Sequence, residues 1–541
     1  MPWPSPYLQS PKAYTSVLMG VRFLSLTLAT FGMLGVGVLK RICPVTSTRP
    51  VIMGIMVIYP HRKSPIAPVV KGILTIWGKC RRINLAQQKY LKIDSLHLQW
   101  MVYGISFHCK WRLSIGAGMT PDQLKIIIAD QQESHRLPEP YITRQLEKRL
   151  IPMAENPEII VLTGVRRSGK STLLQYMRQH QVEKDYYFNF EDERLVQFSS
   201  DDFARLQMVF IELFGVQKTF YFDEIQNIPN WELFVRRLYN EQNKIFITGS
   251  NANLLSEELG SRLTGRYIPL KTFPFSFSEF LQHQAPDLSQ VNLLSTTKTG
   301  QIKKVFNDYC HVGGFPGYIK YQQMEYLNTL YESIIYKDIV VRYKLDNPKS
   351  LRDLVFYLAS NCSKELTYSS LGKLVGIKST TTISSYCAHL ENSFLCFFIH
   401  RYHVSVKTQL QSPRKIYFID HALARSVGFR FSEDKGRMLE NIVFIELKRR
   451  NYEVYYHRDK KECDFLIREN HKITQAIQVC QHLDEEKVKQ REFDGLLEAL
   501  DTHHLDSGLI LTEDTEFSHY IEKSGKSFEI KVTPIWKWLS H

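Results

Sequence analysis

The chain has 541 residues, 44% of them hydrophobic and 23% charged, so it can hold several globular domains and is too apolar to be disordered. Residues 1–118 hold 15 of its 69 basic residues and only one of its 55 acidic residues, and the rest of the chain holds 54 of each. The net charge of +14 is therefore no evidence that residues 119–541 bind nucleic acid. Nine Cys without a C-x-x-C pair argue against a zinc site and favour free thiols in the cytoplasm.

The first 118 residues differ from the rest, because they show no steady helical or strand period. An uncharged run at 23–39 is followed by Lys40 and Arg41, and is slightly short for a membrane span. One interpretation is a membrane segment, with a membrane as partner only if this region is translated. The other, which we favour, is a start codon assigned too far upstream. We then expect the protein to begin at Met119, where charges balance and helical periodicity begins.

Residues 119–280 predict a doubly wound α/β core. Residues 119–157 are helical in pattern, residues 158–163 have the pattern of a buried strand, and strands and helices alternate from there. Residues 164–171 read GVRRSGKS, which fits G-x-x-x-x-G-K-[ST] at every fixed position, and a helix pattern follows. This strand, loop and helix together predict a phosphate-binding loop.

The loop residues divide the work of holding ATP. Gly164 and Gly169 allow backbone N–H groups to face the phosphates, next to the positive end of a helix. Lys170 is expected to reach the β- and γ-phosphates and Ser171 to bind Mg²⁺. The predicted ATP-binding set is completed by Arg167, Ser168 and Thr172.

Two more buried strands supply the groups that hydrolysis needs. The strand at 219–222 ends in Asp223 and Glu224. Asp223 is expected to bind Mg²⁺ through water, and Glu224 to orient and deprotonate the attacking water. The strand at 244–248 leads to Ser250 and Asn251, and we predict that Asn251, or alternatively Ser250, positions that water.

Two arginines follow the third strand, Arg262 and Arg266. An arginine that reaches the γ-phosphate of a neighbouring subunit stabilises the charge of the transition state. We favour Arg266 for this catalytic role, which requires a homo-oligomer. A surface salt bridge is the alternative for either residue.

Several motifs together resemble one family. They are GVRRSGKS at 164–171, YFDEIQ at 221–226, ITGSNA at 247–252, LTGR at 263–266, FSFSEF at 275–280, HVGGFP at 311–316 and YKDIVVR at 336–342. The chain from about 125 to 541 resembles the AAA+-type P-loop ATPases of bacteria and archaea that carry a C-terminal uncharacterised domain related to restriction endonucleases. The resemblance implies a P-loop NTPase core at 119–280, a helical lid at 281–345, a winged helix at 346–430 and a restriction-endonuclease-like α/β domain at 431–541.

Residues 365–395 have a helix–turn–helix pattern of their own. We expect a first helix at 369–374, a recognition helix at 379–394 and two wing strands at 397–403 and 415–418. Small polar side chains and Lys378 could meet DNA phosphates and bases, but winged helices also serve as protein-binding modules. Both uses stay open.

The C-terminal region carries an incomplete nuclease pattern. An endonuclease of the implied fold needs an acid on a helix, an Asp on a strand and Glu-x-Lys on the next strand. Glu440 and Asp464 fit, whereas Gln478 and Cys480 stand where Glu and Lys should be. Lys472, on an adjacent hairpin, is the alternative source of the lysine. We predict a degenerate metal site at Glu440, Asp464 and Gln478, with cleavage unlikely.

The favoured function is an Mg²⁺-dependent ATPase that couples its nucleotide state to the winged-helix and nuclease-like regions. One alternative is a nucleotide-switched DNA-binding protein with little turnover. Another is an ATP-dependent DNA nuclease, against which the missing lysine argues.

Overall fold

The computed structural model describes residues 118–134, 141–250, 263, 265–288, 295–428, 435–523 and 525–540. Before them it places four short strands, β1 (Val36–Val38), β2 (Met56–Ile58), β3 (Met101–Val102) and β4 (Ile105–Ser106), paired β1 with β2 and β3 with β4. The chain divides into two compact units, Met1–Ile115 and Gly116–His541, and everything below concerns the second. Among the described residues, no helix has the length and apolarity to cross a bilayer, and the 23–39 run lies outside them apart from β1.

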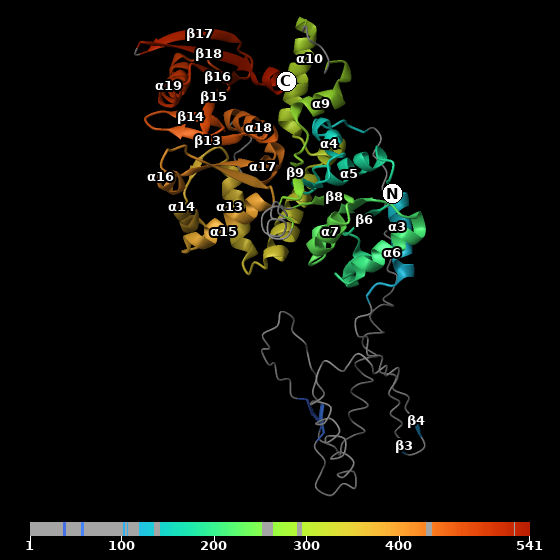
Figure 1. Cartoon of the computed structure of the whole chain (residues 1–541). Coiled ribbons are helices and arrows are strands. Elements are labelled where there is room, and N and C mark those ends of the chain that lie inside the picture. The colour runs from blue at the N-terminus through green and yellow to red at the C-terminus, as the bar shows by residue number, and fades with distance from the viewer. Residues whose placement is uncertain are drawn as a thin grey trace, which may run out of the picture. The chain divides into compact units, whose positions relative to one another are not determined.

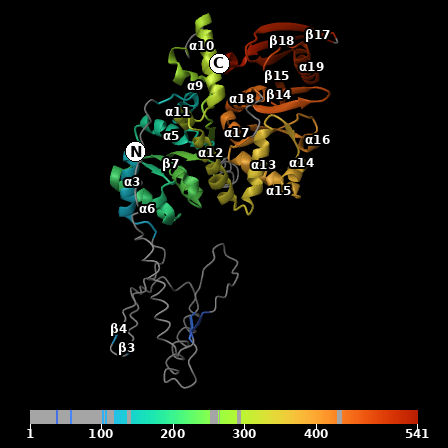
Figure 2. The same ribbon diagram turned by 180° about the vertical axis from the view of Figure 1, so that it is seen from behind.

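A five-stranded parallel sheet forms the first part of the second unit (Figures 1 and 2), as predicted. Its order is β6 (Tyr187–Asn189), β7 (Thr219–Asp223), β8 (Lys244–Gly249), β5 (Ile159–Thr163) and β9 (Tyr267–Lys271). The residues of β5, β7 and β8 are nearly all buried because helices cover both faces, whereas only Leu270 is buried in the edge strand β9.

Alternate strand residues belong to two different cores, as the period of two requires. Ile159 and Val161 pack in a core shared with α3 (Pro121–Ser134), α6 (Asp202–Phe214) and α7 (Trp231–Asn240). Ile160 and Leu162 face the other core, shared with α4 (Glu147–Met153) and α5 (Lys170–Gln179). The short 3₁₀ helices η2 (Glu193–Gln197) and η3 (Ile225–Asn227) lie in connections of this layer.

A helical segment follows β9, in the region where the resemblance implied a helical lid. It contains α9 (Phe277–Gln284), η5 (Pro286–Leu288), α10 (Thr296–Val312), α11 (Pro316–Tyr321), α12 (Met324–Ser333) and the π-helical turn η6 (Ile334–Val341). Helix α9 begins with a capping box, in which Ser276 and Glu279 satisfy each other's backbone N–H groups. The break between α10 and α11 includes Gly313, whose φ of 74° favours glycine.

The next segment surrounds a three-stranded antiparallel sheet. Its elements are α13 (Pro348–Ser360), β10 (Glu365–Leu366), α14 (Tyr368–Leu374), α15 (Thr380–Asn392), β11 (Cys396–His400), α16 (Val406–Gln411), β12 (Arg414–Phe418) and α17 (His421–Val427). The sheet order is β10-β12-β11. Helices α14 and α15 and strands β11 and β12 lie close to the residues predicted for two helices and two wing strands, but the connection between the strands carries α16.

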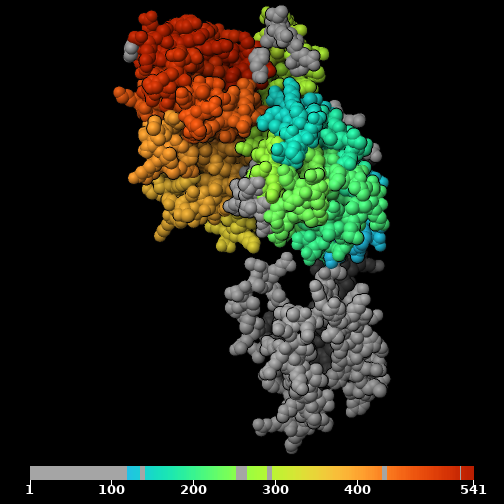
Figure 3. Space-filling model, in the orientation of Figure 1, coloured from blue at the N-terminus to red at the C-terminus, as the bar shows by residue number. Residues whose placement is uncertain are grey.

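The C-terminal segment is a six-stranded mixed sheet with the order β13-β14-β15-β16-β18-β17. Its elements are α18 (Lys435–Arg449), β13 (Glu453–Arg458), β14 (Glu462–Glu469), β15 (Lys472–Val479), α19 (Glu486–His503), β16 (Ser507–Thr512), β17 (Phe517–Lys523), β18 (Lys526–Pro534) and α20 (Ile535–Leu539). One hydrophobic core runs from the helical segment through β11 and β12 to α18 and α20. The orange and red residues accordingly adjoin one another in Figure 3.

Candidate nucleotide-binding site

The phosphate-binding loop turns between β5 and α5 with backbone angles that its glycines permit. Gly164 has φ of 151° and Gly169 φ of 98°, and a Cβ at Gly164 would lie 2.0 Å from the Thr272 carbonyl oxygen. Arg167 adopts a φ of 62° without being glycine. The chain can make this turn at position 164 only without a side chain, which is the physical reason for the first glycine of the pattern.

Lys170 begins α5, and its side chain turns back over the loop. Its Nζ atom donates to the carbonyl oxygens of Gly164 and Val165, at 3.1 Å each, and lies 3.8 Å from Glu224 Oε1. The lysine is 4% exposed and lines the adjacent cavity. The structure thus holds an ammonium group at the N-terminus of a helix, where a phosphate binds most readily.

Asp223 lies at the end of β7 and gathers several hydroxyl groups. Ser171 Oγ donates to its Oδ1 at 3.0 Å, Thr248 Oγ1 donates to the same oxygen, and Tyr187 donates to Oδ2 at 3.4 Å. A serine hydroxyl beside a carboxylate offers the hard oxygen ligands that Mg²⁺ prefers, so these residues fit the predicted metal. The sequence predicted Ser171 and Asp223, but missed Thr248 and Tyr187.

Glu224 follows Asp223 with a left-handed backbone, φ 51°, that directs its side chain into the cavity. Its N–H donates to Thr248 Oγ1 at 3.0 Å, so one threonine hydroxyl bridges both acidic residues. Burial raises the pKa of Glu224, and the charge of Asp223 adds to this, while Lys170 opposes both. A raised pKa suits a group that must accept a proton from water.

A cavity of about 600 Å³ opens over the loop. Ligand sites generally range from about 300 to 1,000 Å³, so this one can take a nucleotide. The predicted Arg167, Gly169, Lys170, Ser171 and Thr172 line it. The helical segment also contributes His283, Lys320, Tyr326 and Lys337, which sequence reasoning missed because nothing local marks them.

Arg166 ties the loop to the helical segment. Its guanidinium makes two bonds of 3.1 Å to the carboxylate of Asp338, which lies in η6, and one of 2.8 Å to Glu191. Ser250 also donates to Asp338, at 3.2 Å. Ser250 therefore contacts Asp338, the partner of Arg166. The contact of Ser250 with the attacking water stays a prediction.

A buried arginine, Arg144, also contacts the phosphate-binding loop. It donates to the carbonyl oxygens of Ser168 and Phe273, at 3.0 and 2.7 Å, and pairs with Glu279 at 3.1 Å. Ser168 itself has a buried hydroxyl with no hydrogen-bond partner among the described residues. Its predicted contact with a nucleotide would satisfy that hydroxyl.

The remaining predicted catalytic residues are not brought to the loop. Asn251 and Arg262 lie outside the described residues. Arg266 directly precedes β9, at the amino end of the parallel strands, where its guanidinium stacks over the Tyr239 ring with 5.8 Å to the ring centroid. Lys170 follows the carboxyl end of β5. Arg266 therefore lies at the opposite end of the parallel strands from its own phosphate loop.

The predicted metal set of the C-terminal segment does converge. Asp464 on β14 accepts from the Val479 N–H at 3.0 Å, and its own N–H donates to Gln478 Oε1 at 3.2 Å. Glu440 on α18 shares a cation with Asp464, the ammonium group of Lys415 on β12. Lys472 cannot join them, because it precedes Gln478 by six residues, about 20 Å along the strand.

Comparisons with known proteins agree with the site. The profile of an AAA domain matches residues 156–281, and two domains of unknown function match residues 303–434 and 435–538. An uncharacterised protein of Methanocaldococcus jannaschii is 33% identical over 413 residues, 73% of this chain and 90% of the relative. The chain belongs to this AAA-domain family. A further relative, from Haemophilus influenzae, is 34% identical over 373 residues, 66% of this chain and 90% of its own length.

The solved structures found to be similar are distant from this AAA-domain protein. The replication initiator DnaA bound to AMPPCP and single-stranded DNA is 14% identical, over 47% of this chain and 90% of its own, with a TM-score of 0.23. PCH-2 of C. elegans is 14% identical, over 33% and 48%, with a TM-score of 0.18. Such scores are too low to carry an argument, so the P-loop NTPase core rests on the AAA-domain match and on the site itself.

Proposed function

We propose that this protein is an Mg²⁺-dependent ATPase. One observation carries the proposal: Lys170, Ser171 and Glu224 line one cavity, Asp223 accepts a hydrogen bond from Ser171, and Thr248 joins the two acids. Phosphate binding, metal binding and water activation each have a residue there, so a turn that merely resembles a phosphate loop does not explain the arrangement.

The residues suggest a division of labour. Lys170 would exchange its two carbonyl partners for phosphate oxygens and offset their charge. Ser171 and Asp223 would hold Mg²⁺, which neutralises charge on the β- and γ-phosphates. Glu224, with its raised pKa, would take the proton of a water molecule in line with the γ-phosphate. Asn251 stays our proposal for the residue that orients this water.

We also propose that Arg266 acts on a neighbouring subunit of a homo-oligomer. Arg266 lies at the end of the parallel strands opposite its own phosphate loop. This place supports the proposal, because an arginine there is directed away from the nucleotide of its own subunit. Mixing Arg266→Ala protein with Lys170→Ala protein tests it. Each alone should be inactive, and activity should return in the mixture, since some sites then pair an intact loop with an intact arginine. A mixture without activity would contradict a role in trans.

Coupling to the rest of the chain would run through Arg166 and Asp338. The pair joins the phosphate loop to η6, so phosphates that attract Arg166 would weaken its hold on the helical segment. We propose that 346–430 is a winged helix, supported by the order α13-β10-α14-α15-β11-α16-β12, and that 431–541 is a restriction-endonuclease-like domain, supported by the order α18-β13-β14-β15-α19-β16. DNA is one partner that such a winged helix could bind, and the cytoplasm is the proposed compartment.

Phosphate release measured on the full chain tests the proposed function. Turnover should require Mg²⁺ and disappear in Lys170→Ala, and stimulation by DNA would favour DNA as the partner. Tight ATP binding without turnover in the wild type would contradict an ATPase and favour the nucleotide-switched alternative. The DNA-nuclease alternative predicts cleavage that requires ATP.

A further inference from the structure

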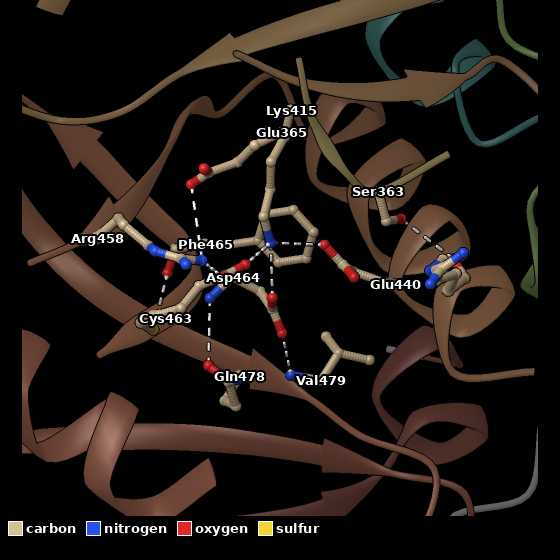
Figure 4. A network of polar contacts seen from close by, with 12 residues as sticks. Ser363, Glu365, Lys415, Glu440, Arg458, Cys463, Asp464, Phe465, Gln478 and Val479 are labelled. Carbon is tan, nitrogen blue, oxygen red and sulfur yellow. Dashed lines mark hydrogen bonds and ion pairs between the residues drawn. The ribbon is translucent and has the colours of Figure 1, made fainter. Parts of the chain in front are cut away.

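Besides Lys170 in the nucleotide-binding site, a second buried lysine, Lys415, lies beside acidic residues between β12 and the C-terminal sheet (Figure 4). Lys415 projects from β12, and its side chain is 2% exposed. Its Nζ atom lies 2.7 Å from Glu462 Oε1, 2.8 Å from Asp464 Oδ1 and 3.1 Å from Glu440 Oε1. Three carboxylates from α18 and β14 thus surround one ammonium group, which comes from outside their segment.

Acidic side chains surround the ammonium group. It donates hydrogen bonds to Glu440 and Asp464 and forms an ion pair with Glu462, whose Oε1 atom lies 2.7 Å away. Glu440 on α18 and Asp464 on β14 are the carboxylates with which an endonuclease of the proposed fold would hold a divalent cation. Lys415 therefore stands where that cation would bind.

The surrounding groups fix the carboxylates in this arrangement. Tyr417 donates to Glu440 Oε1 at 2.6 Å, and the Val479 N–H donates to Asp464 Oδ2 at 3.0 Å. Burial raises the pKa of Glu440 to about 8, and the nearby charge of Asp464 acts in the same direction. The pKa of Lys415 is raised well above its usual range despite burial, because Asp464 and Glu440 favour its charged form.

The lysine lies behind the carboxylates as seen from the adjacent cavity. That cavity measures about 740 Å³, and Glu440, Glu462 and Asp464 line it, whereas Lys415 does not. A ligand in the cavity would meet the carboxylates before it met the ammonium group. The lysine is consequently placed to neutralise the acids and is badly placed to act on a bound phosphate.

We propose that Lys415 is the permanent cation of this centre, so that the centre binds no divalent metal and instead joins β12 to the C-terminal sheet. A nuclease of the proposed fold has a catalytic lysine at the position of Cys480, and Lys415 does not take over its catalytic role. A structural cation supplied by the neighbouring segment takes the position of the metal. This inference does not depend on ATP hydrolysis.

Mn²⁺ binding followed by electron paramagnetic resonance, without nucleotide, tests the proposal on the full chain. Wild type should bind no Mn²⁺ at this centre, so Asp464→Asn should leave its titration unchanged. Lys415→Gln should gain an Mn²⁺ site that the wild type does not show even at tenfold higher Mn²⁺ concentration, and adding Asp464→Asn should remove that site. Lys460→Gln is the matched control, because Lys460 lines the same cavity but is exposed.

Lys415→Gln leaves buried acids without a partner, so its folding is checked by near-ultraviolet circular dichroism. If Lys415→Gln fails to fold, the double variant Lys415→Met with Glu440→Gln is used in its place. It removes the lysine together with one of its acidic partners. A wild-type protein that binds Mn²⁺ through Asp464 would overturn the proposal. So would cleavage of plasmid DNA by the wild type that Lys415→Gln abolishes, and so would a folded variant without any gain in Mn²⁺ binding.

Discussion

Two buried lysines in this molecule lie beside acidic residues, and their partners give them opposite roles. Lys170 donates to two neutral carbonyl oxygens, and its nearest carboxylate oxygen is 3.8 Å away. Lys415 has three carboxylates within 3.1 Å. Backbone carbonyls orient an ammonium group without cancelling its charge, whereas ionised carboxylates beside it offset that charge.

The comparison shows that burial next to acids does not by itself mark a catalytic lysine. Lys170 lines its cavity and can exchange its carbonyl partners for an incoming phosphate. Lys415 lies behind the acids that line its cavity, and displacing it would leave buried charges unpaired. The first site is open to a ligand, and the second is closed by the protein itself.

The largest effect is expected at Glu224. Glu224→Gln should lower phosphate release by about 10²- to 10⁴-fold, the usual contribution of a general base, while ATP binding is retained. Stopped assays of phosphate release, with binding of a fluorescent ATP analogue measured on the same protein, check this. Equal loss of binding and turnover would mean that Glu224 holds the site together and does not activate water.

Lys415→Gln should lower the unfolding free energy by about 3–5 kcal/mol, because it leaves buried carboxylates without their cation. Lys170→Gln should cost only about 1 kcal/mol, since it removes hydrogen bonds to two carbonyl groups and a longer contact, 3.8 Å, with Glu224. Urea unfolding of both variants and of wild type checks the contrast. Similar losses in the two variants would break the comparison between the lysines.

Thr248→Val should weaken Mg²⁺ binding in the presence of ATP by about 10- to 100-fold, because the hydroxyl that fixes Asp223 and Glu224 is lost. Thr248→Ser keeps the hydroxyl and should restore most of the affinity. The Mg²⁺ dependence of phosphate release gives the measurement. If Thr248→Val needs no more Mg²⁺ than wild type, Asp223 is not the metal ligand that we propose.

Asp338→Asn should lower kcat about tenfold, because a neutral amide replaces a paired carboxylate and costs the Arg166 contact about 1–1.5 kcal/mol. The KM for ATP should change little, since Asp338 does not line the cavity. Asp338→Glu should recover part of the activity. An increase in KM with an unchanged kcat would place Asp338 in nucleotide binding and not in coupling.

The phosphate loop could be predicted from the sequence because its signal is local. Eight consecutive residues fix the turn, the lysine and the helix start, and a buried strand directly precedes the acids at 223 and 224. The doubly wound sheet followed from the same alternation, and the two cores observed on its faces agree with it.

The contacts that support both sites could not be predicted, because they join residues far apart in the chain. Asp338 reaches Arg166 across 172 positions, and Glu279 reaches Arg144 across 135. In the C-terminal segment, the sequence indicated what was missing at Gln478 and Cys480. It gave no sign that Lys415, which precedes the acids on another strand, fills the cation position.

The most direct test counts bound metal in the presence of nucleotide. The full chain, saturated with a non-hydrolysable ATP analogue, would be titrated with Mn²⁺. We expect one Mn²⁺ for each chain, lost in Asp223→Asn and retained in Asp464→Asn. Two Mn²⁺ for each chain, or one that depends on Asp464, would contradict the account.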